Sequence, residues 1–361
     1  MYLIDWITMS QHHEAMEGQL PIIDGACIMK AKRISLDIND YEFEWASKTK
    51  YQVKGSYDTS IQVKCDGSTV WIDGNVGRFN RRDNVFGFDI DQVVEICNRI
   101  VGSLGLPPFT KGKVFLNPDM SKPSEMYSTT GATISKLDIT RNYATGSAEN
   151  AQTFIDYLRT LSMSHVRQGQ MQDTTVYWGG RGSRKNVKAY IKHLEMAKHA
   201  KSKVERLKIQ NSKIYKYCER VGLVRIEHTI SRKTLFDTGL RFLSNVTMAK
   251  LIKLFDERAN ELLGRVKTDL KSFDLADLPN PLQNTAILYF EGYNMKKRLP
   301  KSTYYRHLKQ LKAYGIDISV EHLHAKELSP KIVNINVSPI MELPDFYQLD
   351  VNRPVLRVVN G

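Results

Sequence analysis

Apolar and polar residues alternate in short runs, separated by turns, through the first 75 residues of the chain. The runs include YLIDWITM, YEFEWAS, SIQVKCD and STVWIDGN. Because successive side chains of a strand point to opposite faces, this alternation predicts antiparallel β-strands, each with one buried face. Apolar residues at helical spacing follow over about 89–101 and again over about 149–163. The pattern therefore predicts an α+β chain that begins with an antiparallel sheet.

The most informative stretch is residues 174–192, where two alternating runs flank a turn rich in glycine and arginine. This pattern predicts a β-hairpin whose second strand has Lys188, Tyr190 and Lys192 on one face. A tyrosine hydroxyl beside two ammonium groups suits attack on a phosphodiester, because nearby cations favour the phenolate and attract the phosphate. The alternative is a structural strand tyrosine beside two solvated lysines.

Two more strands with clean alternation are predicted over 131–140 and 223–235. The apolar residues of both strands face the core, and His228 alternates onto that same side as a packed histidine rather than a ligand. The opposite face of each strand carries a polar trio, Lys136, Asp138 and Thr140 in the first and Arg225, Glu227 and Thr229 in the second. If both strands neighbour the hairpin, these side chains converge with Tyr190 on one face of a single sheet.

This predicted face has the residue types of a metal-assisted phosphodiester site. Asp138 and Glu227, together with water, would bind Mg²⁺ or Mn²⁺, because hard cations prefer oxygen ligands. Lys188, Lys192 and Arg225 would hold the phosphate. Attack by a tyrosine rather than by water keeps the bond energy in a covalent intermediate, so that the strand can be resealed without ATP. The predicted chemistry is therefore attack of a tyrosine on a nucleic-acid backbone.

The chain is strongly basic, with 52 Lys and Arg against 39 Asp and Glu and a net charge of +13. Such a surface favours polyanions, nucleic acid before membrane. A long basic helix is predicted over about 194–217. The candidate DNA contacts are Arg78, Arg81, Arg82, Arg181, Arg184, Lys185, Lys301, Arg306 and Lys309. The alternative for each of these basic segments is an ordinary solvated surface.

Two exclusions follow from composition. No apolar run approaches the roughly 20 residues of a membrane span, so no membrane partner is expected. The four cysteines are widely spaced and form no CxxC, so neither a zinc knuckle nor a disulfide framework is indicated. The cysteine pattern fits a reducing cytoplasm.

From about residue 246 the pattern becomes helical. Residues 301–315, KSTYYRHLKQLKAYG, follow a short turn and place Tyr305, Leu308 and Leu311 inward and basic residues outward. This is the pattern of a recognition helix in a helix-turn-helix or winged-helix domain. Many helical hairpins share it, so an ordinary packing helix is the alternative.

Several motifs, taken in order, resemble the gene II replication initiators of filamentous phages, the phage replication protein II/X family. They are NVFG at 84–87, ATISKLDIT at 132–140, VYWGG and KAYIKHLE in the hairpin, GLVRIEHTISRKTL at 222–235, LPKSTYYRHLKQLKAYGI at 299–316 and PDFYQLDVNRPVLRV near the end. The hairpin and its two partner strands are also similar to rolling-circle Rep and HUH-like nicking enzymes. The resemblance implies an antiparallel-sheet nuclease domain with flanking helices over 1–245 and a smaller, mainly helical DNA-binding domain over 246–361.

The resemblance also implies an activity, which is a site-specific, metal-dependent nick in one strand of the phage double-stranded replicative form. It implies a 5′-phosphotyrosine intermediate, extension by a host polymerase and helicase, and rejoining, all in the cytoplasm of a bacterial host. The match to AYxKH assigns the nucleophile to Tyr190, followed by Lys192 and His193. The sequence departs from the HUH pattern in having no His-hydrophobic-His strand, and the resemblance assigns the metal to Asp138 and Glu227 by analogy with the histidine-poor branch. Expected partners are duplex origin DNA and single-stranded DNA, on which a homo-oligomer could form.

A second function, from another class, is a non-catalytic origin-binding regulator of replication or transcription. The basic helix and residues 301–315 would carry it. Such a protein would bind its site equally well with EDTA present and would leave supercoiled plasmid uncut. Cleavage therefore distinguishes the two functions.

Overall fold

The computed structural model describes residues 1–25, 27–33, 41–117, 126–161, 173–180, 183–184, 186–263, 278–314, 316, 318–319 and 335–350. The chain divides into two compact units. Unit 1 consists of residues 1–2, 140–229 and 252–348, and unit 2 consists of residues 3–139, 230–251 and 349–361. Both units combine segments that lie far apart in the sequence, and the boundary at residue 245 stays a prediction.

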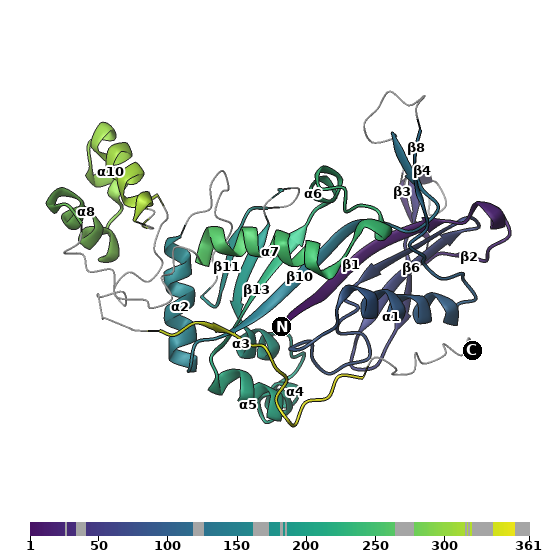
Figure 1. Cartoon of the computed structure of the whole chain (residues 1–361), viewed down its shortest axis with the longest axis horizontal. Helices are drawn as coiled ribbons and strands as arrows, with labels where there is room; N and C mark the ends of the chain where they lie inside the picture. The colour runs from purple at the N-terminus through teal and green to yellow at the C-terminus, as the bar shows by residue number, and fades with distance from the viewer. Residues whose placement is uncertain are drawn as a thin grey trace. The chain divides into compact units, whose positions relative to one another are not determined.

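The strands of unit 1 form a sheet in the order β11-β12-β13-β10 (Figure 1). Their bounds are β11 Thr175–Trp178, β12 Val187–Ile191, β13 Leu223–Ile230 and β10 Thr133–Ala144, of which residues 140–144 belong to this unit. The short strand β14, Ser338–Pro339, pairs antiparallel with the end of β10. β12 is antiparallel to β11 and to β13, so the predicted hairpin and its neighbouring strand are confirmed.

Before residue 264, the helices of unit 1 are α2 Ala148–Thr160, α3 Lys192–Lys198, α4 Lys203–Gln210, α5 Lys213–Arg220 and α7 Met248–Leu263, the last from residue 252 onward. α7 lies over the strands of this sheet (Figure 1). Its Phe255 packs edge-on against Tyr2 at 5.4 Å between ring centroids, and its Asp256 lies 3.8 Å from Arg141. α7 therefore packs on the sheet, although it follows the predicted domain boundary.

The predicted long helix over 194–217 is wrong, because the structure has three short helices there. The hydroxyl of Ser202 accepts a hydrogen bond from the Glu205 amide, and that of Ser212 accepts one from the Tyr215 amide. Each serine is thus the N-cap of a new helix, because its side chain satisfies an amide that has no partner inside that helix.

In unit 2 the strand order is β10-β1-β7-β6, with β2 and β5 each paired to β6. The bounds are β1 Tyr2–His12, β2 Ile22–Ile23, β5 Tyr51–Lys54, β6 Ser60–Asp66 and β7 Thr69–Gly74. The N-terminal antiparallel strands predicted by alternation are thus confirmed. Two separate two-stranded sheets are formed by β3 Cys27–Arg33 with β4 Tyr41–Lys48 and by β8 Val114–Leu116 with β9 Tyr127–Thr129.

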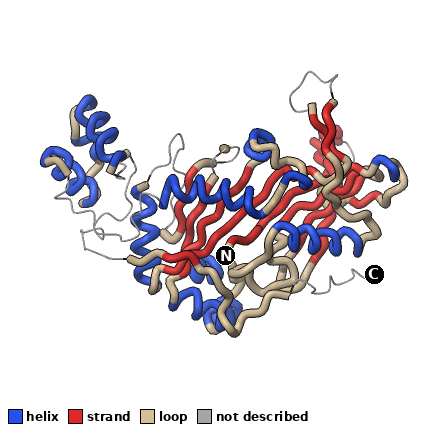
Figure 2. Tube along the Cα trace, in the orientation of Figure 1, coloured by secondary structure: helices blue, strands red, loops and turns tan. Residues whose placement is uncertain are grey.

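One face of the unit 2 sheet is the core, and its side chains Ile7, Ile61 and Ile72 are fully buried. Helix α1, Ile90–Ser103, lies across these strands (Figures 1 and 2). A reciprocal pair of hydrogen bonds between Asp89 and Gln92 caps its N-terminus. The short helix α6, Arg232–Asp237, also belongs to this unit.

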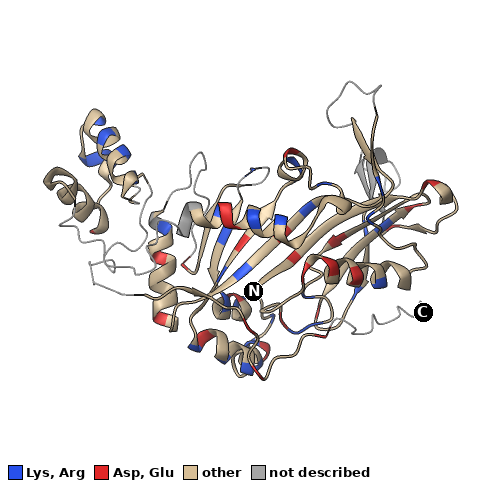
Figure 3. Ribbon diagram, in the orientation of Figure 1, with Lys and Arg blue, Asp and Glu red and all other residues tan. Residues whose placement is uncertain are grey.

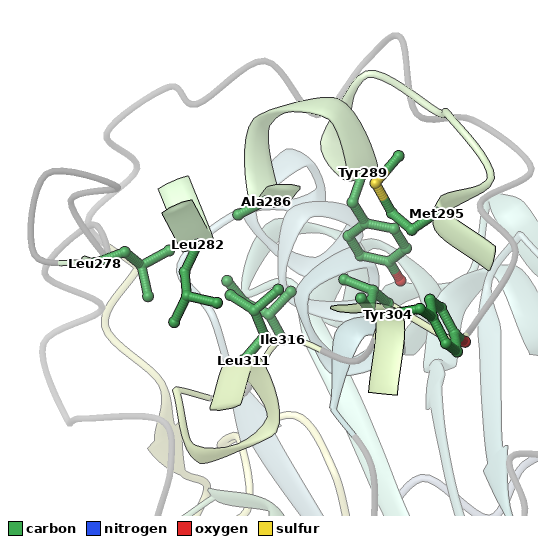
Figure 4. Packing of buried hydrophobic residues seen from close by; sticks show 9 residues of the cluster. Leu278, Leu282, Ala286, Tyr289, Met295, Tyr304, Leu311 and Ile316 are labelled. Carbon is green, nitrogen blue, oxygen red and sulfur yellow. The ribbon is translucent and has the colours of Figure 1, made fainter. Parts of the chain in front are cut away.

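Three helices near the C-terminus form their own hydrophobic cluster: α8 Asn280–Phe290, α9 Met295–Arg298 and α10 Lys301–Ala313. Its buried members are Leu278, Leu282, Ala286, Tyr289, Met295, Tyr304, Leu311, Ile316 and Ile318 (Figure 4). The helical C-terminal region is therefore confirmed. The predicted inward position of Tyr305 is wrong, because α10 buries Tyr304, His307 and Leu311 and leaves Tyr305 52% exposed.

The α+β class with a large antiparallel sheet is confirmed. None of the helices in the described ranges is both long enough and apolar enough to cross a bilayer. Cys65, Cys97 and Cys218 are buried and not in disulfides.

Candidate active site

Tyr190 lies on β12, where its hydroxyl is 3.4 Å from Oε2 of Glu227 on the neighbouring strand β13. The Lys188 ammonium lies 4.2 Å from the centre of the tyrosine ring and 3.9 Å from the same Glu227 oxygen. A phenol, an ammonium and a carboxylate therefore meet on one face of the sheet. The tyrosine is only 2% exposed in the DNA-free chain.

The strand register explains why these residues meet. Lys188 is directly opposite Glu227, and Tyr190 is directly opposite Arg225. Directly opposed residues of antiparallel strands share a face. The convergence predicted for β12 and β13 is therefore present in unit 1.

Arg225 is fully buried, which the alternation of its strand does not predict. Its Nε donates a 2.9 Å hydrogen bond to Oδ1 of Asn142 on β10. Arg225 is thus not an open phosphate clamp in this structure. It ties β13 to β10 directly opposite the tyrosine, so we assign it a positioning role.

Lys192 is not on the strand face predicted for it. It is the first residue of α3, is 1% exposed, and its ammonium lies 2.8 Å from Glu195. Burial alone would raise the pKa of the Glu195 carboxyl, but the Lys192 charge and hydrogen bonds from His199 and Lys192 hold that pKa well below its usual range. The ammonium still lies 5.6 Å from the centre of the Tyr190 ring. Its main partner is nonetheless a structural carboxylate.

Sequence patterns do not single out three other polar residues near these strands as parts of the site. Glu195 and Asn142 stand out only as partners of buried cations. His193 follows the candidate nucleophile by three residues, is buried, and packs edge-on against Tyr215. Burial lowers the pKa of His193, so the imidazole is neutral at physiological pH.

The candidate metal ligands belong to different units. Glu227 is in unit 1, and Asp138 is in unit 2, where its carboxylate lies 3.4 Å from Lys136. Within the ranges that the structure describes, no three or more His, Cys, Asp or Glu side chains gather as a metal site. The joint binding of a metal ion by Asp138 and Glu227 therefore stays a prediction.

The basic loop predicted to contact DNA has two kinds of arginine. Arg81 is buried and donates hydrogen bonds to the carbonyls of Gly77 and Phe86, so its guanidinium holds the loop together. Arg82 is exposed and Arg78 partly so, and only these two remain candidates for phosphate contact. The sequence pattern does not separate the two kinds.

The other candidate DNA contacts lie in the hairpin turn and on α10. Arg184 is exposed, whereas Arg181 and Lys185 fall outside the described residues. The α10 residues Lys301, Arg306 and Lys309 are all exposed. α9 and α10 together carry basic but no acidic side chains (Figure 3). A basic helical surface is thus available, as predicted.

Comparison with known proteins identifies relatives over nearly the whole chain. The N-terminal family of the phage replication-associated protein, the gene II product, matches residues 3–249, and the C-terminal family of the same protein matches residues 270–353. The replication-associated protein of Enterobacteria phage I2-2 is 22% identical over 94% of this chain and 93% of its own length. That of Escherichia phage If1 is 27% identical over 76% of this chain and 91% of its own length.

A solved structure, the rolling circle replication initiator protein from Geobacillus stearothermophilus, aligns with 71% of this chain and 84% of its own at 12% identity. The TM-score of 0.31 is too low to define a shared fold. The two family matches together cover most of the chain, on both sides of the interval 250–269. The chain therefore belongs to the replication-associated protein family of filamentous phages, the gene II-type replication initiators.

Proposed function

We propose that this protein initiates rolling-circle replication by nicking and rejoining one strand of a phage double-stranded replicative form. The nucleophile is Tyr190 and the intermediate is a 5′-phosphotyrosine. The observation that carries this proposal is the contact of the Tyr190 hydroxyl with Glu227, beside the Lys188 ammonium, in a chain of a replication-initiator family. This arrangement combines a nucleophile, a proton acceptor and a cation.

In the proposed reaction the phenol oxygen attacks the scissile phosphorus. A bond forms between Tyr190 Oη and phosphorus while the bond from phosphorus to the 3′ oxygen breaks. Glu227 accepts the phenol proton, and the 3′ oxygen leaves and takes a proton to become a free hydroxyl. Lys188 offsets the negative charge on the phosphate. Rejoining is the reverse reaction, in which a 3′ hydroxyl attacks the phosphotyrosine and restores the phenol.

The burial of Tyr190 adds a requirement to this proposal. A side chain that is 2% exposed cannot meet a phosphodiester, so the segments over it must be displaced when DNA binds. Lys192 is part of the same buried region and contributes through its ion pair with Glu195. We assign it to holding α3 in place rather than to the phosphate.

Metal dependence is part of the proposal, with Mg²⁺ or Mn²⁺ held by Glu227 and Asp138 together with water. Mg²⁺ is often bound by one or two carboxylates and keeps several waters, so two carboxylates are a chemically reasonable set. When bound, the ion would stabilise negative charge on the phosphate. The proposed partners are the displaced single-stranded DNA and a host polymerase and helicase. We also propose that the protein acts in the host cytoplasm, as a homo-oligomer on the origin.

The test is incubation of the full-length protein with supercoiled plasmid carrying the phage origin and Mg²⁺. The expected products are open circles with protein attached to the 5′ end, and no product from a plasmid without the origin. Tyr190→Phe should give neither cleavage nor adduct. Cleavage without attached protein would show a hydrolytic nuclease and contradict the proposal.

A second candidate function is a non-catalytic origin-binding regulator. Two observations favour it, namely the buried candidate nucleophile and the exposed basic surface of α10. Such a regulator would bind origin DNA with unchanged affinity in EDTA and produce no open circles under any divalent-ion condition.

A further inference from the structure

The sheet of unit 2 has two unlike faces. Its apolar face is fully buried, as shown by Ile7, Val63 and Ile72. The opposite face, which we call the tryptophan face, consists of polar, basic and aromatic side chains that are partly exposed. Its residues are Trp6, Thr8, Ser10, Lys50, Gln62, Lys64, Trp71, Asp73 and Lys136. A sheet with one solvated face needs no aromatic residues there, so two tryptophans on it call for an explanation.

The register places these side chains in rows across the strands. Ser10 of β1 and Lys64 of β6 are both directly opposite Trp71 of β7. In the next row, Thr8 and Gln62 are both directly opposite Asp73. Because directly opposed residues share a face, both rows belong to the same side of the sheet.

Each tryptophan on this face has a lysine over its ring. The Lys64 ammonium is 5.2 Å from the centre of the Trp71 ring, and the Lys136 ammonium is 4.5 Å from that of Trp6. The two pairs are repeats of one motif, a flat aromatic surface with a cation beside it. Such a motif binds a base by stacking and the adjoining phosphate by charge.

A hydrogen-bond network holds the Trp6 ring in place. Its indole N–H donates to Asp73 Oδ1 at 2.9 Å, and the Thr8 hydroxyl donates to the same oxygen at 2.6 Å. The Lys50 ammonium donates to the other oxygen of Asp73 at 2.9 Å. The ring is therefore preorganised, so little conformational entropy is lost when a ligand stacks on it.

Two of the acidic groups on this face, Asp73 and Asp138, are paired with lysines, and a third, the exposed Asp66 at the end of β6, accepts hydrogen bonds from the amides of Ser68 and Thr69. Asp73 is satisfied by Lys50, and Asp138 lies against Lys136. Lys54 and Lys64 lie on the same side of β5 and β6, and neither makes a direct ion pair with a carboxylate of the described ranges. Burial alone would raise the pKa of Asp66, but its backbone hydrogen bonds and the nearby charge of Lys64 outweigh burial and lower that pKa. The charge available to a ligand is therefore positive, which suits a polyanion.

We propose that the tryptophan face binds single-stranded DNA, with bases stacked on Trp6 and Trp71 and phosphates near Lys64 and Lys136. Trp6 is four residues along β1 from Ser10, the partner of Trp71, so the two rings are attached about 13 Å apart along the strand. Bases in a duplex are stacked about 3.4 Å apart and paired inside the helix. Rings with the wider spacing fit unpaired bases of an extended strand.

This inference deepens the proposed function, because nicking and displacement produce single-stranded DNA next to the protein. The binding itself involves neither Tyr190 nor Glu227. Binding and cleavage can therefore fail independently. A variant of the tryptophan face would lose strand binding and keep the nucleophile, whereas Tyr190→Phe would lose the adduct and keep strand binding.

The test uses full-length protein, EDTA and a fluorescein-labelled oligothymidylate without origin sequence, so that no cleavage intervenes. Binding is followed by fluorescence anisotropy and by quenching of tryptophan emission. Trp71→Ala should weaken binding on the order of tenfold and Trp71→Phe, which keeps a stacking ring, only slightly. Lys64→Gln should reduce the salt dependence of binding by about 0.7 in the log–log slope.

Two matched controls remove the same groups elsewhere in unit 2. Phe115→Ala removes an aromatic ring that is 46% exposed on β8. Lys111→Gln removes an exposed lysine that is paired with Asp91 of α1 and is not part of the tryptophan face. Both should bind the oligonucleotide like wild type, and circular dichroism should show native folding for every variant.

The proposal fails if Trp71→Ala is folded and binds within about twofold of wild type, or if it loses no more affinity than Phe115→Ala. It also fails if oligouridylate binds at least tenfold more tightly than oligothymidylate with the same dependence on Trp71, because the face would then be an RNA-binding surface. Loss of oligonucleotide binding in Trp71→Ala, together with a wild-type protein that forms no open circles, would support this inference and contradict the proposed function.

Discussion

The hydroxyl of Tyr190 and the carboxylate of Glu227 lie 3.4 Å apart on adjacent antiparallel strands. The sequence separates them by 37 residues, and the register of β12 with β13 brings them together. A carboxylate at this distance can accept the phenol proton, and hydrogen bonds of this kind are often long before substrate binds. The pair is therefore the centre of the site from which the first two predictions follow.

Tyr190→Phe should abolish the covalent adduct and leave origin binding unchanged, because it removes only the nucleophilic oxygen. The matched control is Tyr177→Phe on β11, which is directly opposite Lys188. Adduct formation is measured by transfer of a labelled 5′ phosphate to the protein. Wild-type adduct in Tyr190→Phe would assign the nucleophile elsewhere, first to Tyr177 and then to Tyr143, whose pKa is raised to about 12 by burial.

Glu227→Gln should reduce nicking by at least two orders of magnitude with little effect on DNA binding, since loss of a proton acceptor or metal ligand typically costs that much. Asp138→Asn should have a comparable effect if it holds the same ion. Nicking is measured over a Mg²⁺ titration. A rate in Asp138→Asn equal to wild type at low Mg²⁺ would leave Asp138 as the structural partner of Lys136.

The alternation of polar and apolar residues predicts the strands of this site well. Leu137 and Ile139 are fully buried, as predicted, and Lys188 and Glu227 share a face. Periodicity has this power because the pleat of a strand fixes which residues share a side. It also predicts that His228 is a packed residue, and His228 is 1% exposed.

The sequence does not reveal what covers a polar strand face. Arg225 and Tyr190 lie on the polar face of their strands and are nevertheless buried, because coverage depends on tertiary packing rather than on strand period. Lys192 continues the two-residue alternation of β12, but it is the first residue of α3. Alternation alone does not show where the strand ends and the helix begins. Ser202 and Ser212 begin new helices within the basic segment. Serine is a common N-cap residue, so the sequence contains this information, but counting charges does not use it.

Lys192→Met should destabilise the fold rather than the chemistry. The substitution removes the cation that lies 2.8 Å from the Glu195 carboxylate. Removal of one partner of a fully buried ion pair lowers the free energy of unfolding by roughly 3–5 kcal/mol. We expect about 2 kcal/mol here, because Glu195 is 25% exposed and its charge is partly screened by water. Urea unfolding gives this value, and the double variant Lys192→Met with Glu195→Gln should recover most of it. A folded, fully stable Lys192→Met that cannot form the adduct would instead return Lys192 to the phosphate.

His228 should make unfolding pH-dependent below neutrality. Burial, with a smaller contribution from the charge of Arg258, lowers the pKa of His228 from its ordinary value to about 3. Between the unfolded pKa of about 6.5 and this folded value, only the unfolded chain binds the proton, so stability falls as pH falls, by up to about 1.4 kcal/mol per pH unit.

The variant His228→Leu tests whether His228 causes this pH dependence. Both ring nitrogens lack a hydrogen-bond partner in the described part of the chain, so an apolar replacement leaves no new unsatisfied group. In urea unfolding, the variant should have the same free energy of unfolding as wild type at pH 7. That free energy should fall less steeply than in wild type between about pH 6.5 and 5. An unchanged slope would assign the dependence to the other buried histidines, His193 and His307.

The exposed basic face of α10 should provide preference for duplex origin DNA and not chemistry. Its buried face, Tyr304, His307 and Leu311, holds the helix on the C-terminal cluster, and the His307 ring lies 2.8 Å from the Thr285 hydroxyl of α8. Arg306 and Lys309 contribute nothing to that packing, since both are exposed. The double change Arg306→Gln with Lys309→Gln should therefore leave the fold intact.

The expected result is weaker binding to duplex origin, with a salt slope reduced by roughly 0.9 for each phosphate contact removed, and unchanged cleavage of a single-stranded origin oligonucleotide. Lys250→Gln with Lys253→Gln on α7 is the charge-matched control, because both lysines are exposed and the net change is the same. If the α10 variant keeps wild-type affinity and selectivity across the salt titration, α10 is a packing element. Origin recognition would then lie with Arg78 and Arg82 or with the basic helices that follow the hairpin.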